Sequence, residues 1–388
     1  MRLSSLAPAV LAAVSVASGW IGWSGVPELL PVTLLFPLVW SLAATRAAAM
    51  LVSASYFLAA TRSLPQAVAI FYATDIWPGL ALWLVASLTF VSVHTVLWTG
   101  KGELVHATRY LIASLLMALP PFGIVGWAHP ITAAGALFPG YGWFGLGATA
   151  AGQMMLTTRW RPAAVVALGF SWVWSASTWT PLTVPEGWHA MDLELGSSLG
   201  RNSSLLRQRD LLSTIRTKTA GTAQIVVLPE SALGFWTPTV ERFWQDGLQG
   251  SRVTVIAGAV EVDSFGYDNI MVAMAENRPS IVYRQRVPVP GAMWQPWRVW
   301  LGESGGATAS FFRNPYVDLP SHRVAALICY EQLIVWPILQ SMYRSPDIVV
   351  AIGNGWWTGG TPIISIQLAS ARSWARLFNK PLISAFNR

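Results

Sequence analysis

The first 180 residues consist of long apolar runs separated by short polar breaks. A membrane-spanning helix needs about 20 mostly apolar residues, and seven runs approach that length. They cover residues 5–23, 26–44, 47–60, 76–98, 110–127, 139–157 and 162–180. Tryptophans lie near the ends of several runs, as aromatic residues do at membrane interfaces. The pattern predicts a polytopic α-helical membrane domain over residues 1–184, with about seven transmembrane helices.

From His189 onward, short apolar stretches alternate with amphipathic ones. The apolar stretches predict strands at 189–195, 224–233, 252–260, 322–331, 347–354 and 381–386, and residues 267–286 predict two strands joined at 276–278. Helical spacing predicts helices at 205–220 and 363–378. Apolar strands without alternation indicate sheets that are covered on both faces. We therefore expect an α/β sandwich over residues 185–388.

Composition supports this division of the chain. Hydrophobic residues make up 53% and charged residues 11%, whereas soluble domains carry about 25% charged residues. Residues 1–188 hold only seven of the 25 basic and four of the 18 acidic residues. The net charge of +7 is not gathered in a basic run or an Arg-rich helix. Direct binding of nucleic acid is therefore not expected.

The basic residues of the first half predict a topology. With seven spans and a cytoplasmic N-terminus, only Arg62 lies outside. The other six lie on the cytoplasmic side: Arg2, Arg46, Lys101, Arg109, Arg159 and Arg161. Omitting the third segment removes this bias, so seven spans agree better with the positive-inside rule. An odd number places residues 189–388 outside the cytoplasm. In a bacterium, this predicts a multi-pass protein of the inner membrane with its C-terminal domain in the periplasm.

Three apolar strands end in polar residues that suggest chemistry: Glu230, Cys329 with Glu331, and Asn354. Sites in α/β folds collect at the carboxyl ends of strands. Cys329 is the only cysteine and cannot form an internal disulfide. It is either a nucleophile with Glu230 as its base or a packing residue, and Glu230 is alternatively a helix cap. The five histidines have no metal-ligand spacing, so neither a metal nor another cofactor is expected.

The order of the motifs resembles a known superfamily. VVLPES, YDN, IVYRQRVPVP, ALICYE, AIGNGWWTGGTP and RLFNKPLISAFN follow one another as in the nitrilase (carbon–nitrogen hydrolase) superfamily. Joined to a polytopic half, they resemble apolipoprotein N-acyltransferase. The stretch YRQRVPVPGAMWQPW resembles in particular the TraB family of conjugal transfer proteins of Agrobacterium-type plasmids. The resemblance implies an αββα sandwich for residues 185–388.

The resemblance also assigns residues to a site. The superfamily uses a Glu–Lys–Cys triad in which Glu is the general base, Cys forms an acyl-enzyme and Lys stabilises the oxyanion. Glu230 matches the base and Cys329 the nucleophile, and Glu331 matches an accessory glutamate of the acyltransferase branch.

Further residues are expected to contact the substrate. Trp357 matches a tryptophan that lines the acyltransferase pocket. With it we expect Tyr330, Asn354 and Arg286 to form the substrate-binding set.

The chain departs from the family pattern at the lysine position, which is Gln285. A neutral donor in place of a charged one costs roughly a hundredfold to a thousandfold in rate. Arg284 and Arg286 flank this position, but regular strand alternation points both to the opposite face. In addition, no acid follows the VP motif until Glu303, where the acyltransferase branch has a glutamate soon after it. The sandwich also lacks the family's last strands and closing membrane helix, which predicts an exposed sheet edge.

Three functional hypotheses follow. The first is an inner-membrane accessory protein of plasmid conjugal transfer, working with the transfer apparatus, whose nitrilase-like chemistry is lost, changed or retained as cysteine-dependent acyl transfer. The second is an active N-acyltransferase that moves an acyl group from a phospholipid to a lipoprotein or other amine through a Cys329 thioester. The third, ranked lowest, is an amidase that releases ammonia. Whether the chain is an enzyme stays open because Glu and Cys of the triad are present and Lys is not.

Overall fold

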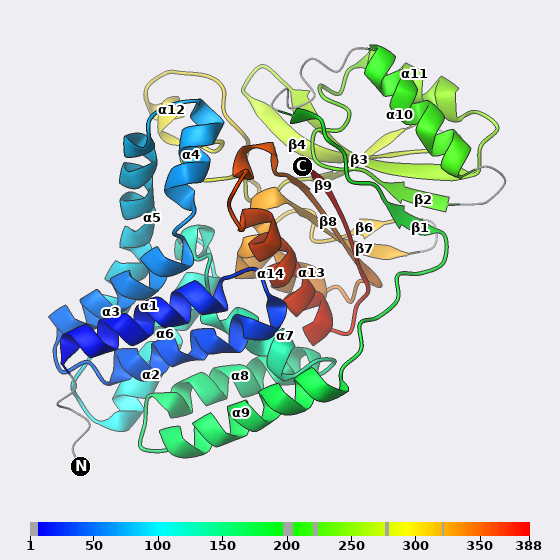
Figure 1. Ribbon diagram of the computed structural model, residues 1–388. Coiled ribbons are helices and arrows are strands. Elements are labelled where there is room, and N and C mark those ends of the chain that lie inside the picture. The colour runs from blue at the N-terminus through cyan, green and yellow to red at the C-terminus, as the bar shows by residue number, and fades with distance from the viewer. Residues whose placement is uncertain (1–6, 197–204, 220–223, 276–278, 320–321) are drawn as a thin grey trace. The chain divides into compact units, whose positions relative to one another are not determined.

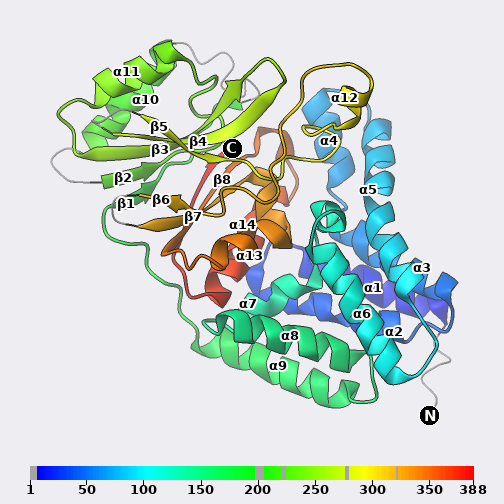
Figure 2. The same ribbon diagram turned by 180° about the vertical axis from the view of Figure 1, so that it is seen from behind.

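The computed structural model describes residues 7–196, 205–219, 224–275, 279–319 and 322–388. The chain forms two compact units. A helical unit comprises Met1–Pro181, Leu333–Trp336 and Thr358–Lys380, and an α/β unit comprises Leu182–Gln332, Pro337–Trp357 and Pro381–Arg388. Figure 1 and Figure 2 show helices in the first and two sheets in the second. The domain limits of 1–184 and 185–388 stay a prediction.

The helical unit contains helices at all seven segments that the sequence predicts. Its elements are α1 (Pro8–Gly22), η2 (Pro27–Leu34), α2 (Leu35–Ser41), α3 (Arg46–Ala60), α4 (Leu64–Tyr72), α5 (Ile76–Leu97), α6 (Glu103–Ala118), η3 (Phe122–Val125), η4 (Pro130–Ala133), α7 (Ala134–Leu137), α8 (Gly142–Leu156), α9 (Arg161–Thr178) and, from later in the chain, α14 (Ile363–Leu377). The element η7 (Trp356–Thr358) leads into α14.

Most of these helices are shorter than the apolar runs. Among the described residues, only α5, with 22 residues, is long and apolar enough to cross a membrane, and the pair α3 and α4, bent by 49°, adds a second span if counted as one. Helix α1 has 15 residues and is about 22 Å long, less than the roughly 30 Å of a bilayer core. Prolines explain part of the shortening, since Pro27 and Pro31 hold the second segment in a 3₁₀ helix before α2. The prediction of about seven transmembrane helices is therefore not confirmed.

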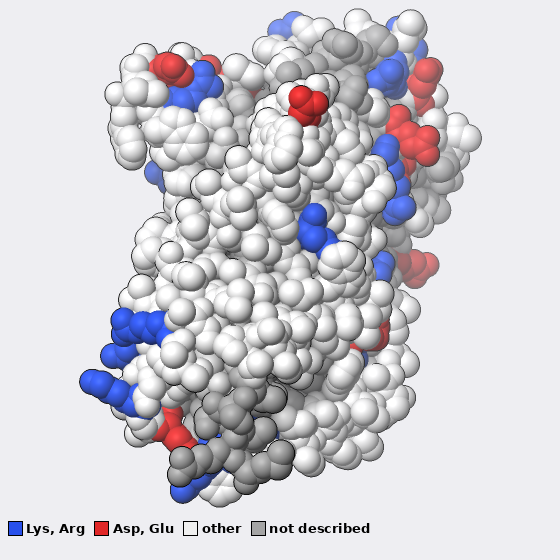
Figure 3. All heavy atoms as spheres, turned by 60° about the vertical axis from the view of Figure 1, so that its left-hand side comes forward, with Lys and Arg blue, Asp and Glu red and all other residues white. Residues whose placement is uncertain are grey.

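The surface of the helical unit is nonetheless apolar along two helices. Large exposed side chains of α5 are Ile76, Trp77, Leu84, Val85, Leu88 and Val96, and those of α9 are Val165, Val166, Phe170, Val173 and Trp174. Figure 3 shows one face of the molecule on which uncharged residues cover most of the area. Exposed apolar patches of this extent mark sites of interaction with protein or lipid.

The α/β unit contains two sheets. The first has the order β1-β2-β3-β4-β5 and the second the order β6-β7-β8-β9. Their strands are β1 (Trp188–Ala190), β2 (Gln224–Val227), β3 (Val253–Val262), β4 (Tyr267–Met274), β5 (Ser280–Arg284), β6 (Val317–Asp318), β7 (Arg323–Ile328), β8 (Ile348–Asn354) and β9 (Leu382–Asn387). Strands β1 to β3 are parallel, as are β7 to β9, whereas β4, β5 and β6 pair antiparallel.

Two hydrophobic cores hold the α/β unit together. One lies between the sheets and joins residues such as Val227 and Met271 of the first sheet to Ile328 and Val350 of the second. The other lies between the first sheet and the helices α10 (Leu205–Lys218) and α11 (Pro238–Leu248). The predicted α/β sandwich is therefore confirmed. The predicted joint at 276–278 lies outside the described residues.

In the α/β unit, the sequence did not predict helix α11, the short helices α12 (Trp297–Trp300) and α13 (Val335–Met342), or strand β6. In the helical unit, it did not predict α4 or α7. The expectation of an exposed edge at the last strand is wrong. Residues 192–195 cover this edge, because the N–H of Leu193 donates to Phe386 O at 3.0 Å and the N–H of Arg388 donates to Leu193 O at 2.8 Å. The edge strand is therefore paired within the chain.

Candidate active site

Cys329 lies at a sharp turn between strand β7 and the 3₁₀ helix η6 (Cys329–Leu333). Its φ of 50° is in the left-handed region, which residues with a side chain rarely adopt. Strained backbone of this kind is often found at functional sites. The thiol side chain is buried at 6% exposure and also packs against the core between the sheets. The turn therefore fixes the thiol at the carboxyl end of a parallel strand.

Glu230 lies in the turn that follows strand β2, and the glycine Gly258 of β3 makes room for it. A Cβ at Gly258 would lie 2.5 Å from Glu230 Cα, so no larger residue fits without displacing the turn. Gly258 also donates its N–H to Pro229 O at 3.1 Å. Helix α11 begins later, at Pro238, and is capped by Thr237. The alternative that Glu230 is a helix cap is thus excluded.

The Glu230 carboxylate is buried beside the Cys329 thiol. Its Oε1 accepts a hydrogen bond from Asn269 Nδ2 at 3.0 Å, while no described residue donates a hydrogen bond of normal geometry to Oε2. The pKa of Glu230 is raised to about 7, mainly by burial and further by the nearby Glu331. Hydrogen bonds from the Cys329 thiol and from the backbone N–H of Asn354 lower this pKa in part. A carboxylate with this pKa can act as a general base near neutral pH.

Gln285, at the position where the family has lysine, joins the same buried network. Its Oε1 accepts from Asn269 Nδ2 at 3.0 Å, and its Nε2 donates to Ile328 O, next to Cys329, at 3.1 Å. The side chain is 3% exposed. It supplies hydrogen-bond donors close to the thiol but no positive charge.

Glu331, in contrast, is surrounded by donors. Tyr283 Oη donates to both carboxylate oxygens at 2.9 Å. The backbone N–H groups of Arg286, Val287 and Ile328 donate at 2.7, 3.2 and 2.8 Å. The Arg286 guanidinium lies 3.8 Å away from Oε1 and completes a buried ion pair. Glu331 therefore ties the end of β5 to the turn that carries Cys329.

The pKa of Glu331 is raised by burial, and Arg286, the N–H of Ile328 and the Tyr283 hydroxyl lower it. Its two oxygens accept from the Tyr283 hydroxyl and three backbone N–H groups. Glu331 is suited to holding the site together rather than to moving a proton.

Arg284 and Arg286 have different surroundings. Arg284 lies on the partly exposed side of the strand and pairs with Glu261 and with Asp268. Strand β5 ends at Arg284, so alternation no longer applies to Arg286, which is fully buried. Its guanidinium donates to Tyr283 Oη, Gln340 Oε1, Ser341 Oγ and Ala326 O.

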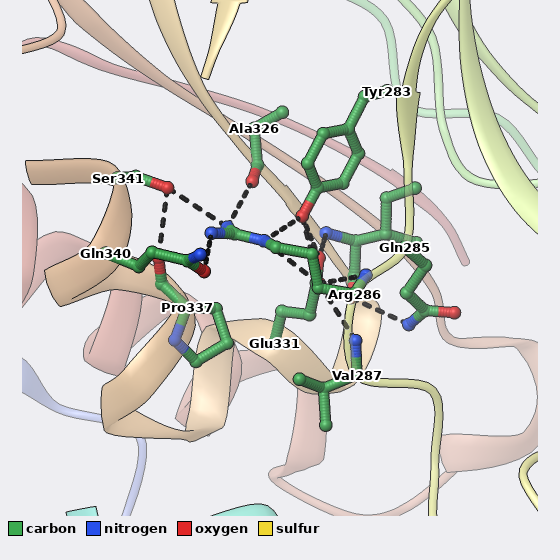
Figure 4. Close-up of polar contacts among 10 residues, drawn as sticks. Tyr283, Gln285, Arg286, Val287, Ala326, Glu331, Pro337, Gln340 and Ser341 are labelled. Atoms are coloured by element: carbon green, nitrogen blue, oxygen red, sulfur yellow. Dashed lines mark hydrogen bonds and ion pairs between the residues drawn. The ribbon is translucent and has the colours of Figure 1, made fainter. Parts of the chain in front are cut away.

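Figure 4 shows the Arg286 guanidinium and the Gln285 amide pointing in opposite directions. Arg286 is therefore not a substitute for the missing lysine in this structure. Its predicted contact with a substrate stays a prediction, as do the contacts of Tyr330, Asn354 and Trp357.

These last three residues surround the strand ends. Tyr330 directly follows Cys329 and is buried. Asn354 ends strand β8, where its Oδ1 accepts from Asn387 Nδ2 at 2.8 Å and its carbonyl accepts from Trp357 Nε1 at 2.9 Å. Within the described ranges, no group of three or more His, Cys, Asp or Glu residues is arranged to hold a metal ion.

Three residues of the site were missed by the sequence analysis: Asn269, Tyr283 and Gly258. Asn269 belongs to the YDN motif, and Tyr283 belongs to the motif IVYRQRVPVP, two positions before Gln285. Their membership of these motifs was the available signal, because strand β5 ends at Arg284 and alternation does not extend to Gln285. Nothing local indicated that Gly258 contacts Glu230, because that approach depends on how β2 and β3 pair.

Comparison with known proteins identifies the family of the chain. The family model described as carbon–nitrogen hydrolase matches residues 58–376. The chain therefore belongs to the carbon–nitrogen hydrolase family and, by its relatives, to the TraB family within it.

The two TraB relatives match over nearly their whole length, and the other two proteins match in part. A probable conjugal transfer protein TraB of Sinorhizobium fredii is 57% identical over 100% of both chains. A conjugal transfer protein TraB of Agrobacterium fabrum is 56% identical over 98% of this chain and 92% of that protein. An apolipoprotein N-acyltransferase of Verminephrobacter eiseniae is 24% identical over 79% of this chain and 60% of that protein. A solved carbon–nitrogen hydrolase of Helicobacter pylori is 14% identical over 51% of this chain and 72% of that one, with a TM-score of 0.38.

Proposed function

We propose that the chain acts in conjugal plasmid transfer and that its carbon–nitrogen hydrolase domain performs acyl transfer. The full-length similarity to proteins named conjugal transfer protein TraB supports the role in transfer. One observation carries the chemistry: the buried Glu230 carboxylate lies beside the Cys329 thiol, which donates to it. A cysteine nucleophile needs such a base, because the thiolate is the reactive form.

The proposed reaction has two steps. Glu230 Oε2 takes the proton from Cys329 Sγ, and the thiolate attacks the carbonyl carbon of an acyl donor. The bond between that carbon and its leaving group breaks, and the leaving group takes the proton from Glu230. An amine then attacks the resulting thioester, the C–S bond breaks, and the amine's proton passes through Glu230 to the sulfur as the amide forms.

Gln285 is the side chain that supports oxyanion stabilisation in this scheme. An amide nitrogen has two N–H groups, and Ile328 O accepts only one of those on Gln285 Nε2. A neutral donor is weaker than an ammonium group, so a slower reaction than that of a lysine-containing family member is expected. A phospholipid donor and a lipoprotein acceptor are the finer form of this proposal. Similarity to an apolipoprotein N-acyltransferase supports it.

A second candidate function is a scaffold without chemistry. Two observations favour it: Gln285 brings no charge to the site, and Cys329 packs into the core between the sheets. In this case, the nitrilase-like domain serves the transfer apparatus through its surfaces alone.

We also propose that the chain is an inner-membrane protein with the α/β unit in the periplasm. The apolar exposed faces of α5 and α9 support membrane contact, and the placement of basic residues supports the orientation. Alkaline phosphatase fused after Arg388 reports the side directly, since it is active only outside the cytoplasm. The orientation would be contradicted if the fusion after Arg388 were inactive and a fusion at the predicted cytoplasmic end of α5 were active.

The chemistry is tested by plasmid transfer frequency with Cys329→Ala and Cys329→Ser, each matched to wild type in amount by immunoblot. Both variants are expected to transfer at the level of a full deletion, because neither supplies a thiolate. Serine preserves the size and polarity of the side chain, so a loss in both variants separates chemistry from packing. Wild-type transfer in both variants would contradict acyl transfer and leave the scaffold function.

A further inference from the structure

A buried chain of hydrogen bonds through Asn269 and Gln285 connects the base Glu230 to the turn of the nucleophile. Asn269 Nδ2 lies 3.0 Å from Glu230 Oε1 and 3.0 Å from Gln285 Oε1, and Gln285 Nε2 lies 3.1 Å from Ile328 O. All three side chains are less than one-tenth exposed. Asn269 is thus the only member that touches both the carboxylate and the residue at the lysine position.

The strands place Asn269 there for a simple reason. On β4, Ile270 faces the core below the helices, whereas Met271 faces the core between the sheets. Side chains alternate along a strand, so Asn269 shares the inner face with Met271. The backbone adds a second tie, because the N–H of Gln285 donates to Asn269 O at 2.8 Å.

Hydrogen-bond complementarity fixes the orientation of both amides. A carboxylate only accepts, so Asn269 must turn its NH₂ group toward Glu230. The second N–H of that group then requires Gln285 to present its oxygen, which leaves Gln285 Nε2 facing Ile328 O. If Asn269 were turned the other way, its oxygen would meet two acceptors. The charge on Glu230 therefore sets the direction of every hydrogen bond from Glu230 through Asn269 and Gln285 to Ile328 O.

We infer that Asn269 is a positioning residue for the Glu230–Cys329 pair: it anchors Oε1 of the base, so that Oε2 faces the thiol, and it aims the donor group of Gln285 at the turn of Cys329. This inference rests on the proposed acyl-transfer function. The proton exchanged with the thiol then resides on Oε2, and Oε1 keeps its donor in both protonation states.

The single cysteine provides the test, because alkylation by iodoacetamide reports on Cys329 alone. The purified full chain is alkylated from pH 5 to pH 10 and the rate is measured by mass spectrometry. When Glu230 ionises, the pair shares one proton, so the wild-type rate should rise in a step at about pH 7, the pKa of Glu230. Glu230→Gln should lack this step and react only as the thiol itself ionises.

Asn269→Ala should lower the plateau above the step by about tenfold, because a hydrogen bond to a charged group is lost. Asn269→Asp keeps the shape and adds a negative charge, so it should move the step at least one pH unit upward. The matched control is Gln208→Ala, which removes another buried amide that bonds Leu233 O and Trp244 Nε1. It should leave both the plateau and the midpoint unchanged.

The outcomes separate the two proposals. If wild type and Glu230→Gln have the same profile, Glu230 is not the base of Cys329, and both the acyl-transfer function and the inference are wrong. If these two differ while both Asn269 variants match wild type or the Gln208→Ala control, only the inference is wrong. Asn269→Asp is isosteric, so it keeps the test decisive if Asn269→Ala does not fold, as judged by circular dichroism.

Discussion

Glu230 and Glu331 are two buried carboxylates near the turn of Cys329, and their surroundings differ in the number of donors. Glu331 accepts from Tyr283 and from three backbone N–H groups, with Arg286 beside it. Glu230 has fewer donors: Asn269 Nδ2, the Cys329 thiol and the backbone N–H of Asn354. A carboxylate whose lone pairs are all occupied is held in place, and it holds its neighbours. Burial raises the pKa of both glutamates, and the one with fewer donors, beside the thiol, is the better placed to exchange a proton. The comparison teaches that burial alone does not identify a base, whereas donor count does.

The largest effect is expected on the Glu331 side. Glu331→Ala leaves the Arg286 guanidinium buried without its counter-charge, which should lower the free energy of unfolding by about 3–5 kcal/mol. Thermal and denaturant unfolding of the purified protein in detergent measures this. Replacing both partners, as Glu331→Leu with Arg286→Met, should recover much of the loss because no unpaired charge remains. A loss below about 1 kcal/mol in the single variant would contradict the structural role.

The pH dependence of stability should come from the Glu230 side. The pKa of Glu230 is raised in the folded state from 4.5 to about 7, so the folded protein holds this proton more tightly than the unfolded chain. The resulting stabilisation is fully present below pH 4.5 and is lost as the pH rises through 7. It amounts to about 3 kcal/mol.

Glu230→Gln cannot titrate, so it serves as the reference for this effect. Relative to that variant, the unfolding free energy of wild type should fall between pH 4 and pH 8, as followed by chemical denaturation at each pH. Parallel curves for the two proteins would show that the carboxylate is not perturbed by burial.

The smallest effect on stability is expected at Gly258, where the base is held by shape alone. A methyl group there would approach Glu230 Cα to 2.5 Å, so Gly258→Ala should cost about 1–3 kcal/mol through overpacking. It should also abolish the step in Cys329 alkylation, since the turn that carries Glu230 must move. Gly169→Ala is the control, because a Cβ there meets nothing within 4 Å. A normal step in Gly258→Ala would contradict the tight approach of β3 to this turn.

Part of this comparison could be predicted from the sequence. Apolar strands that end abruptly in polar residues pointed to Glu230, Cys329 and Glu331, because sites in α/β folds collect at the carboxyl ends of strands. The different roles of the two glutamates could not be predicted, since Tyr283 and Arg286, which donate to Glu331, are 48 and 45 residues away along the chain. Asn269 escaped for the same reason: its two partners are 39 and 16 residues away along the chain.

The elements show a similar limit. Apolar runs predicted helices at the right places but overstated their lengths, because the runs do not reveal where prolines and tight turns interrupt helical hydrogen bonds. Arg286 departed from simple alternation because strand β5 ends two residues earlier. Helix α11 was missed although it faces the core with Trp244 and Leu248.

Helix α14 has a consequence for modularity. It is the crossover between parallel strands β8 and β9, yet it groups with the helical unit, where Ser373 Oγ donates to Thr132 O. The contact is so close that a Cβ on Gly135 would fall 1.7 Å from Ser373 O. A chimaera that exchanged the two halves at a single junction near residue 185 would therefore give α14 a foreign partner surface. Inheritance of the helical part and of the sandwich is coupled through this one helix, so substitutions along α7 and α14 should be accepted only in matched pairs.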